Sequence, residues 1–197
     1  MTRAPQQRRL KTRLRLLEVA REIVATHGYD GLRVEEVVDR AGTAKGTLFA
    51  HFKDKDGLLA AIIGEHVVAH LDQLESHTCP QSIAEFCTRL APLMTYVAED
   101  RVIFDLLLRY SGSTGELVDE TITQFFLRQV DILSVWLDQM QRAGQVRGDQ
   151  PPLMLAEGVQ AFESHVLGLW FCMDHADEET PAAALAPFLQ AWLKAPT

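Results

Sequence analysis

Residues Val34 to Phe52 read VEEVVDRAGTAKGTLFAHF, and this stretch decides the fold. The pattern predicts a short helix over Val34 to Ala41, a tight turn at Ala41-Gly42, and a second short helix over about Ala44 to His51. Two short helices joined by a turn that contains glycine are typical of the helix-turn-helix arrangement, which presents the start of its second helix to the major groove of DNA. Helices this short are unstable alone, so neighbouring helices must hold them.

The charge of the chain is divided unevenly around this stretch. The 197 residues carry a net charge of −8, which by itself argues against a nucleic-acid partner. Residues 1–55, however, have 12 basic and 7 acidic side chains (net +5), whereas residues 56–197 have 7 and 20 (net −13). Such an asymmetry indicates an interaction surface. The basic side chains around the helix pair are Arg8, Arg9, Lys11, Arg13, Arg15, Arg33, Arg40, Lys45, Lys53 and Lys55.

The composition excludes several classes of protein. Hydrophobic residues make up 47% and charged residues 23%, as in an ordinary globular protein. No apolar run of about 18 residues is present, so we expect no membrane-spanning helix. The start of the chain is basic and polar, unlike a secretory signal, and the three cysteines are too few for a disulfide framework, so we expect a cytoplasmic protein.

Nearly every other apolar segment also has a helical period, which predicts an all-α protein of about nine helices. A first helix is expected over about Gln7 to His27, ended by Gly28, and its apolar residues have the spacing of one helix face: Leu10, Leu14, Leu17, Ala20 and Val24. Later helices are expected to begin after Asp54, at capping boxes over Thr78 to Gln81 and Ser113 to Glu116, at Arg101, at Leu153 and after Thr180. The helix over about 116–143 is apolar nearly all round and should lie in the middle of a domain.

The stretch Gly28 to Leu59 resembles the DNA-binding domain of the TetR family of bacterial transcriptional regulators. The match lies in AGTAKGTLFAHFKDKDGLL, Ala41 to Leu59. The resemblance implies an N-terminal three-helix DNA-binding domain over residues 1–55 and a C-terminal helical bundle for ligand binding and dimerisation over residues 56–197. It further implies a homodimeric repressor, without a cofactor, that binds a palindromic double-stranded DNA operator and is released by a small-molecule effector.

The resemblance also implies which residues contact DNA: Arg33, Thr43, Lys45, Gly46, Thr47, Phe49, His51 and Lys55. Phe49 stands where the family commonly has tyrosine, so a phosphate contact through the hydroxyl is lost. Leu32 and Arg33 replace the usual Thr and Ser, so the usual cap of the first helix of the pair is absent. Thr43-Ala44 replaces a common Val-Ser pair, which leaves the cap of the second helix undecided.

In the family the C-terminal bundle holds a ligand cavity. We expect its lining from Phe86, Leu90, Met94, Phe104, Leu107, Leu108, Phe126, Phe162 and His165. For each of them, packing in a solid core is the alternative. Glu163 and His165 interrupt an apolar helix and are the best polar groups, although His165 could instead satisfy a buried carbonyl. The acidic charge favours a cationic or neutral apolar ligand over an anion.

The end of the chain predicts a dimer surface. Apolar residues from Leu155 to Met173 are spaced 4, 3, 4, 3 and 4 residues apart, a seam suited to helix packing. Two such helices from each subunit would form a twofold interface. The expected interface residues are Leu155, Val159, Val166, Leu169, Met173, Leu185, Phe188 and Trp192, with an intramolecular core as the alternative.

Three other classes of function can be compared with the residues of the chain. A metal-responsive regulator would use His66, His70, His77 and Cys79, but no complete ligand framework is present, so no metal site is expected. An enzyme is not expected, because no nucleophile elbow, phosphate-cradling loop or metal-ligand set is found. A dimeric small-molecule-binding protein that does not bind an operator remains open, as does activation in place of repression.

Overall fold

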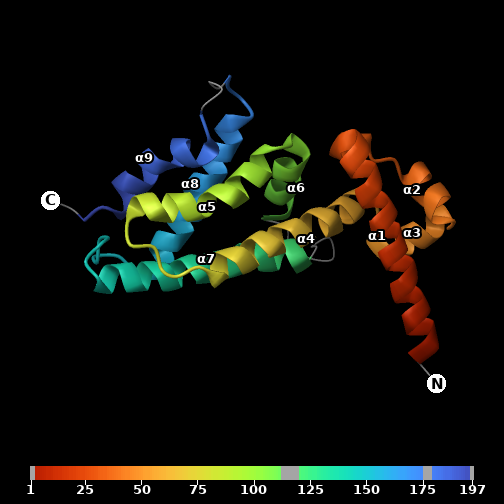
Figure 1. Cartoon of the computed structure of the whole chain (residues 1–197), viewed down its shortest axis with the longest axis horizontal. Coiled ribbons are helices and arrows are strands. Elements are labelled where there is room, and N and C mark those ends of the chain that lie inside the picture. Colours follow the sequence, from red (N-terminus) through yellow and green to blue (C-terminus); the bar gives the residue numbers. More distant parts are fainter. Residues whose placement is uncertain (1–2, 112–119, 175–178, 196–197) are drawn as a thin grey trace. The chain divides into compact units, whose positions relative to one another are not determined.

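The computed structural model describes residues 3–111, 120–174 and 179–195, and this part of the chain contains nine helices and no strand. The all-α fold class predicted from the sequence is therefore confirmed. In chain order (Figure 1) the helices are α1 (Arg3–Gly31), α2 (Val34–Ala41), α3 (Lys45–Phe52), α4 (Lys55–Ser76), α5 (Ile83–Ala98), α6 (Arg101–Ser111), α7 (Glu120–Arg142), α8 (Pro152–Trp170) and α9 (Pro181–Leu193).

The chain forms two compact units, which divide between His66 and Val67 inside α4. Ion pairs show why the division falls there. Glu65 in the first part of α4 pairs with Arg21 of α1, whereas Arg128 of α7 pairs with acidic side chains of the later turns of α4. The functional boundary expected after residue 55 stays a prediction, and the structural units divide later because α4 contributes to both.

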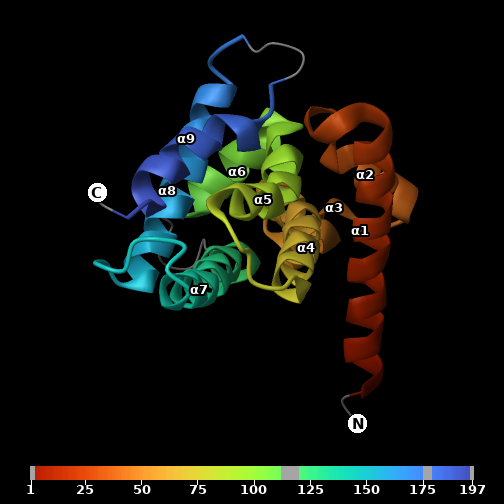
Figure 2. The ribbon, with the colours of Figure 1, turned by 60° about the vertical axis from the view of Figure 1, so that its left-hand side comes forward.

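In the N-terminal unit α1 packs against α2 and α3, and α2 packs against α3. The first turns of α1 project past the two short helices (Figures 1 and 2), so Leu10 and Leu14 are 56% and 52% exposed. These two leucines lie on the expected apolar face of α1, but the described neighbours cover that face only from Leu17 onward. The side chains that form the core of this unit include Leu16, Leu17, Val19, Ala20, Ile23, Val37, Leu48 and Phe52.

Glycines and caps define several of the helix ends as predicted. Gly28 interrupts α1 at φ 71° and ψ 174°, a conformation that glycine adopts without strain. The side chain of Asp54 accepts a hydrogen bond from the N–H of Gly57 (2.8 Å) at the start of α4. Thr180 caps α9 by accepting a hydrogen bond from the N–H of Ala183 (3.2 Å).

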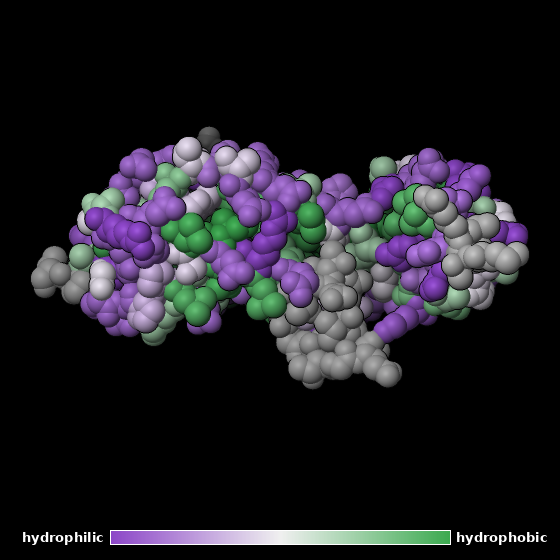
Figure 3. Space-filling view, turned by 90° about the horizontal axis from the view of Figure 1, so that it is seen from below, coloured by the Kyte–Doolittle hydropathy of each residue, from purple (hydrophilic) through white to green (hydrophobic). Residues whose placement is uncertain are grey.

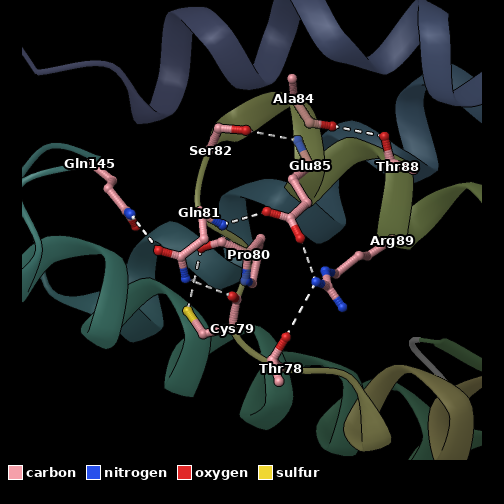
Figure 4. Close-up of polar contacts among 10 residues, drawn as sticks. All are labelled: Thr78, Cys79, Pro80, Gln81, Ser82, Ala84, Glu85, Thr88, Arg89 and Gln145. Atoms are coloured by element: carbon pink, nitrogen blue, oxygen red, sulfur yellow. Dashed lines mark hydrogen bonds and ion pairs between the residues drawn. The ribbon is translucent and has the colours of Figure 1, made fainter.

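The capping box expected over Thr78 to Gln81 was wrong. α5 begins later, with Ser82 as its cap: the Ser82 hydroxyl accepts the N–H of Glu85 (3.1 Å), and the Glu85 carboxylate accepts the N–H of Gln81 (2.7 Å) (Figure 4). Thr78 instead accepts a hydrogen bond from Arg89. The second expected box, Ser113 to Glu116, lies outside the described residues.

In the C-terminal unit α5 packs along α9 and against α6 and α8, while α7 packs along α8. The core contains many of the predicted side chains of α7, but Leu127 and Val135 are each 57% exposed. α7 is therefore amphipathic rather than buried all round. In Figure 3 the surface of this unit shows separate hydrophobic patches between hydrophilic side chains. Among the described helices, none is both long and apolar enough to cross a membrane.

Candidate functional site

The helix-turn-helix predicted over Val34 to Phe52 is present. Gly42 adopts the left-handed conformation (φ 65°, ψ 40°), and its N–H donates to the carbonyl of Asp39 (3.1 Å). The N–H of Thr43 then donates to the carbonyl of Val38 (2.9 Å). These two bonds close the end of α2 and direct the chain into α3, which begins at Lys45.

Both short helices begin without a side-chain cap. Arg33 precedes α2 and Ala44 precedes α3, and neither side chain accepts a hydrogen bond from its helix. Instead, Arg33 donates to the carbonyls of Asp30 (2.5 Å) and Leu32 (3.2 Å). The first N–H groups of a helix lack partners inside the helix and bind anionic oxygens well. The absence of the usual cap, which the sequence predicted for α2, thus extends to α3.

The start of α3 presents Lys45, Gly46 and Phe49 to solvent. Nζ of Lys45 is 2.5 Å from a carboxylate oxygen of Glu35 and 5.8 Å from the centre of the Phe49 ring. Hydrogen bonding to Lys45 lowers the pKa of Glu35. A Cβ atom at Gly46 would meet no atom within 4 Å, so the packing of the unit does not require glycine there. Leu48 is buried and belongs to the core.

A basic groove of about 370 Å³ lies between α1 and α3 and is lined by Gln6, Arg9, Leu10, Arg13 and His51. The Arg13 guanidinium lies 4.4 Å from the centre of the Phe52 ring and donates to the carbonyl of His51 (3.1 Å). Burial, and then the charges of Arg9 and Arg13, lower the pKa of His51. Its imidazole is therefore mainly neutral at pH 7 and retains one N–H donor.

The remaining expected DNA contacts lie around α3. Thr43 and Thr47 are half-buried, and the hydroxyl oxygen of Thr43 is buried without a hydrogen-bond partner. Lys55 is half-buried at the start of α4. Nearby Lys53 has φ 64°, a strained conformation for a residue with a side chain. The sequence shows Arg9 and Arg13 as basic residues. That they share a groove with His51 could not be predicted, because α1 and α3 are far apart in sequence.

The C-terminal unit contains a cavity of about 50 Å³ between α5, α6, α7 and α8. Its lining includes Met94, Phe104, Leu107, Leu108 and Phe126, which were expected there, and also Leu93, Val97, Phe125, Gln129, Gln160, Glu163, Ser164 and Leu167. The other expected residues do not line it. Phe86 packs edge-on against Trp136, Leu90 is fully buried, Phe162 stacks on Phe188, and His165 is exposed beside the Phe188 ring.

A chain of polar side chains runs through the wall of this cavity. The Gln160 amide donates to the carbonyl of Phe126 (3.1 Å) and to Oε1 of Gln129 (3.0 Å). The Gln129 amide in turn donates to Oε2 of Glu163 (2.9 Å). Oε1 of Glu163 is buried and has no partner. Burial raises the pKa of Glu163 to about 8. Gln129 and Gln160 were not predicted to line the cavity, although each is a polar residue within an apolar helix.

The expected dimer residues fall into two groups. Leu155, Val159, Val166 and Leu185 are buried in the chain's own core, so these side chains are not available to a partner. For these four side chains the alternative of an intramolecular core applies. Leu169, Met173 and Phe188 are 43%, 59% and 36% exposed, and Trp192 is half-buried, with its indole N–H donating to the carbonyl of Leu155 (3.2 Å).

The four candidate metal ligands, His66, His70, His77 and Cys79, do not form a cluster. Within the described ranges, no group of three or more His, Cys, Asp and Glu side chains could hold a metal ion. The Cys79 thiol lies 3.5 Å from the carbonyl of Trp136, and burial raises its pKa, which disfavours the thiolate that a metal requires. The His70 ring packs beside Tyr96, with centroids 5.3 Å apart.

Comparisons with known proteins agree with this fold and with the helix pair. Residues 16–62 match the family described as bacterial regulatory proteins, tetR family. The HTH-type transcriptional regulator YvdT of Bacillus subtilis (strain 168) is 32% identical over 101 residues, 50% of each protein, so the chain spans half the length of that relative. A TetR-family regulator from Pectobacterium atrosepticum has the same fold over 100% of both chains (22% identity, TM-score 0.67). SmeT, the repressor of the Stenotrophomonas maltophilia multidrug efflux pump SmeDEF, also has this fold. The match covers 92% of this chain and 90% of SmeT (22% identity, TM-score 0.61).

The helix-turn-helix and the family match both lie in the N-terminal unit, and together they define a DNA-binding domain. Residues 16–62 therefore form a DNA-binding domain of the tetR-family type, and the chain as a whole has the fold of solved TetR-family regulators.

Proposed function

We propose that the chain is a homodimeric cytoplasmic repressor that binds a palindromic operator and releases it when a small, largely apolar ligand enters the C-terminal unit. One observation carries this proposal. Two uncapped helix starts, at Arg33 and Ala44, occur in the same small unit as a basic groove containing Arg9 and Arg13. Free helix N–H groups and guanidinium groups are both suited to the phosphates of a DNA backbone.

The residues of α3 would divide the work of reading DNA. Lys45 and Thr47 reach bases or phosphates from the first turn, and Phe49 packs on a sugar or a thymine methyl group. Gly46 allows close approach, because no packing requirement within the unit explains a glycine there. Lys45 is paired with Glu35 in the free protein, so a phosphate would replace that carboxylate on binding.

The basic groove would hold the phosphate backbone beside α3. Arg9 and Arg13 supply positive charge there, and the neutral His51 imidazole donates one hydrogen bond. Arg33 and Lys55 add phosphate contacts at the starts of α2 and α4. The Thr43 hydroxyl is buried in the free protein, so its expected contact at the turn requires the side chain to change rotamer on binding. The expected DNA contacts are thereby kept and extended by two arginines.

The cavity of the C-terminal unit would bind the ligand. A volume of about 50 Å³ holds a few atoms or waters, whereas a drug-sized ligand needs a site of roughly 300–1,000 Å³. The ligand must therefore displace side chains between α5, α6, α7 and α8. Because packed cores respond in discrete steps, a ligand that fits only the expanded arrangement shifts the protein toward it. Release of the operator would follow from that shift.

The proposed dimer uses the outer faces of α8 and α9. Leu169, Met173 and Phe188 are large apolar side chains exposed on these helices, and a twofold contact would cover them. Sedimentation of the purified chain tests this part: a dimer is expected, and a monomer at micromolar concentration contradicts it.

The central test is DNA binding. The full chain is titrated against a fluorescent duplex that carries the region upstream of its own gene, at rising salt concentrations. We expect a complex that weakens steeply with salt, as phosphate contacts require, and a K45A variant that binds this duplex about tenfold more weakly. If the wild type formed no complex even at low salt, the operator-binding role would be excluded, and a dimeric ligand-binding protein would remain.

A further inference from the structure

One carboxylate oxygen in the C-terminal unit lacks a hydrogen-bond partner. Glu163 is 5% exposed and lines the cavity between α5, α6, α7 and α8. Its Oε2 accepts a hydrogen bond from Gln129 (2.9 Å), whereas its Oε1 is buried and unpartnered. A buried polar atom without a partner destabilises a fold. Its position at a cavity indicates that a ligand supplies the missing group.

Neighbouring side chains determine which oxygen is available. The oxygen of the Gln129 amide accepts a hydrogen bond from Gln160 (3.0 Å), so its NH₂ group is directed to Glu163. Oε2 of Glu163 is therefore always an acceptor. Oε1 either carries the proton of a neutral carboxyl or the charge of a carboxylate, and in both cases it is the atom that a ligand would meet.

The rest of the lining favours a positive charge. Three phenyl rings, of Phe104, Phe125 and Phe126, border the cavity, and the face of an aromatic ring attracts a cation. The described lining contains no Lys, Arg or His side chain that could serve as a counter-ion to Glu163 or to an anionic ligand. The net charge of −13 over residues 56–197 acts in the same direction.

Three classes of ligand can be compared on these grounds. An anion would meet a carboxyl group and no basic side chain. A neutral ligand with a carbonyl would use only the hydrogen bond of the protonated carboxyl. A protonated amine would use the carboxylate, the phenyl rings and the acidic charge of the unit together, so it is the class that fits all three features.

We propose that the ligand of this cavity is an apolar molecule ending in a protonated amine, whose ammonium group donates a hydrogen bond to Oε1 of Glu163 and lies against the rings of Phe104 and Phe126. The inference rests on the proposed ligand-sensing role of this unit. The cavity of about 50 Å³ has room for the ammonium group. Leu108 lines the cavity and is 53% exposed, so the apolar body would extend past this side chain.

Binding of an amine releases a proton from the protein. Burial raises the pKa of Glu163 to about 8, so the empty site holds a neutral carboxyl at pH 6 to 7. The ammonium group favours the carboxylate, and the carboxyl proton passes to the solvent. An alkylammonium, like a lysine side chain, keeps its own proton until about pH 10. The amine must therefore bind more tightly as the pH rises toward 8.

Few other groups can contribute to this pH dependence. On α5, burial and the charge of Glu163 raise the pKa of Cys87, so its thiol stays neutral across this range. On α6 Arg101 pairs with Asp105, and the exposed Arg109 does not line the cavity. On α7 Arg128 pairs with α4, and Asp131 lines a different surface pocket. On α8 His165 is exposed beside Phe188, and α9 carries no charged residue.

The test compares three probes that differ only in their head group. Binding of 4-phenylbutylamine, 4-phenylbutanol and 4-phenylbutyrate to the full chain is measured by titration calorimetry at pH 6, 7 and 8, without DNA. For the wild type at pH 8 we expect the amine to bind at least about 30-fold more tightly than the alcohol, and the acid to bind most weakly. The amine should gain about 50-fold in affinity from pH 6 to pH 8, with proton release detected as a dependence of the heat on the buffer.

Two variants assign the effect to Glu163. E163Q keeps the size of the side chain and should lose both the preference for the amine and its pH dependence, while its affinity for the alcohol stays within about threefold. E157Q removes an exposed carboxylate from the same helix and should behave as the wild type. Circular dichroism of each variant checks that the fold is kept.

The outcomes separate this inference from the proposed function. Equal binding of amine and alcohol, stronger binding of the acid, an equal loss of both probes in E163Q, or no binding of any probe at millimolar concentration overturns the amine assignment. Each of these results leaves the DNA-binding titration unaffected. Loss of DNA binding with intact recognition of the amine would instead reject the regulatory role and keep the site.

Discussion

In the N-terminal unit the charged groups of the candidate site lie at the surface, and Lys45 and Glu35 remain 52% and 69% exposed although they form an ion pair. In the C-terminal unit the central charged group, Glu163, is 5% exposed and has a strongly raised pKa. Water screens the charges of the first kind of group, so Lys45 can exchange Glu35 for a DNA phosphate at little cost. The second kind of group is removed from bulk water, so a ligand that leaves it unpaired is costly to bind, and the site discriminates sharply between ligands.

This difference explains why the two units suit two tasks. A surface that reads DNA has to meet a large, highly charged partner without rearranging, and exposed cations with uncapped helix starts do so. A sensor has to respond to one small molecule, and a desolvated carboxyl changes its protonation state when that molecule arrives.

The largest expected effect is the pH dependence of stability caused by Glu163. The ordinary pKa of this side chain is 4.5, and the folded chain raises it to about 8. Between these values the unfolded chain loses the proton while the folded chain keeps it, so stability is full below pH 4.5, falls as the pH rises, and levels off above pH 8. The loss approaches about 1.4 kcal/mol per pH unit, or roughly 5 kcal/mol in total.

Urea unfolding at several pH values measures this loss. All three tryptophans (Trp136, Trp170 and Trp192) belong to the C-terminal unit, so their fluorescence reports on that unit alone. E163Q should abolish most of the difference between pH 5 and pH 8. If the free energy of unfolding changed with pH in the same way for E163Q and the wild type, Glu163 would be ionised in the folded chain.

A second prediction concerns the close approach of α3 to DNA. Gly46→Leu places a bulky side chain on an open, exposed face, so it should leave stability unchanged but weaken binding to the upstream duplex about 100-fold. Gly148→Leu is the matched control, because a Cβ at Gly148 also meets no atom within 4 Å and the residue lies in the other unit. Equal affinity of both variants would remove α3 from the DNA interface.

A third prediction concerns the packing of α8 against α9. A Cβ at Gly158 would lie 2.5 Å from the indole nitrogen of Trp192, whereas a Cβ at Gly168 would lie 3.6 Å from the Phe104 ring. Gly158→Ala should therefore destabilise the unit by about 2 kcal/mol. Gly168→Ala should be neutral or stabilising by up to about 1 kcal/mol, because alanine favours helix. Tryptophan fluorescence in urea measures both, and equal stabilities would contradict this packing.

The smallest expected effect is that of the exposed Leu14 on α1. Leu14→Ala should change the stability of the N-terminal unit by less than about 0.5 kcal/mol, because Leu14 is 52% exposed. Leu17→Ala, at a residue 3% exposed, should cost about 3 kcal/mol. Thermal unfolding followed by circular dichroism compares the two. A large loss in the Leu14 variant would indicate that the first turns of α1 are covered in the dimer.

Local signals in the sequence predicted much of the fold. The turn at Gly42, the break at Gly28 and the caps at Asp54 and Thr180 depend only on neighbouring residues, and each is present. The predicted start of α5 was wrong, because Thr78 to Gln81 and Ser82 to Glu85 both fit a capping box. Tertiary contacts decide between them.

The candidate sites were predicted less completely, because they also depend on tertiary contacts between helices. Helical periodicity shows which face of a helix is apolar, but it does not show where opposing side chains leave a gap. Phe86 and Leu90 share their apolar face with Met94, yet only Met94 lines the cavity. The bond from Gln129 to Glu163 joins residues 34 positions apart, which no local pattern reveals.

The link between the two units is tested most directly by adding the amine probe to the DNA complex. The wild-type chain and E163Q are each bound to the fluorescent upstream duplex at pH 8, and 4-phenylbutylamine is titrated in while anisotropy is followed. We predict that the amine releases the duplex from the wild type and leaves the E163Q complex intact. If the amine binds the wild type and the complex persists, or if both complexes dissociate at the same concentration, Glu163 does not control operator release.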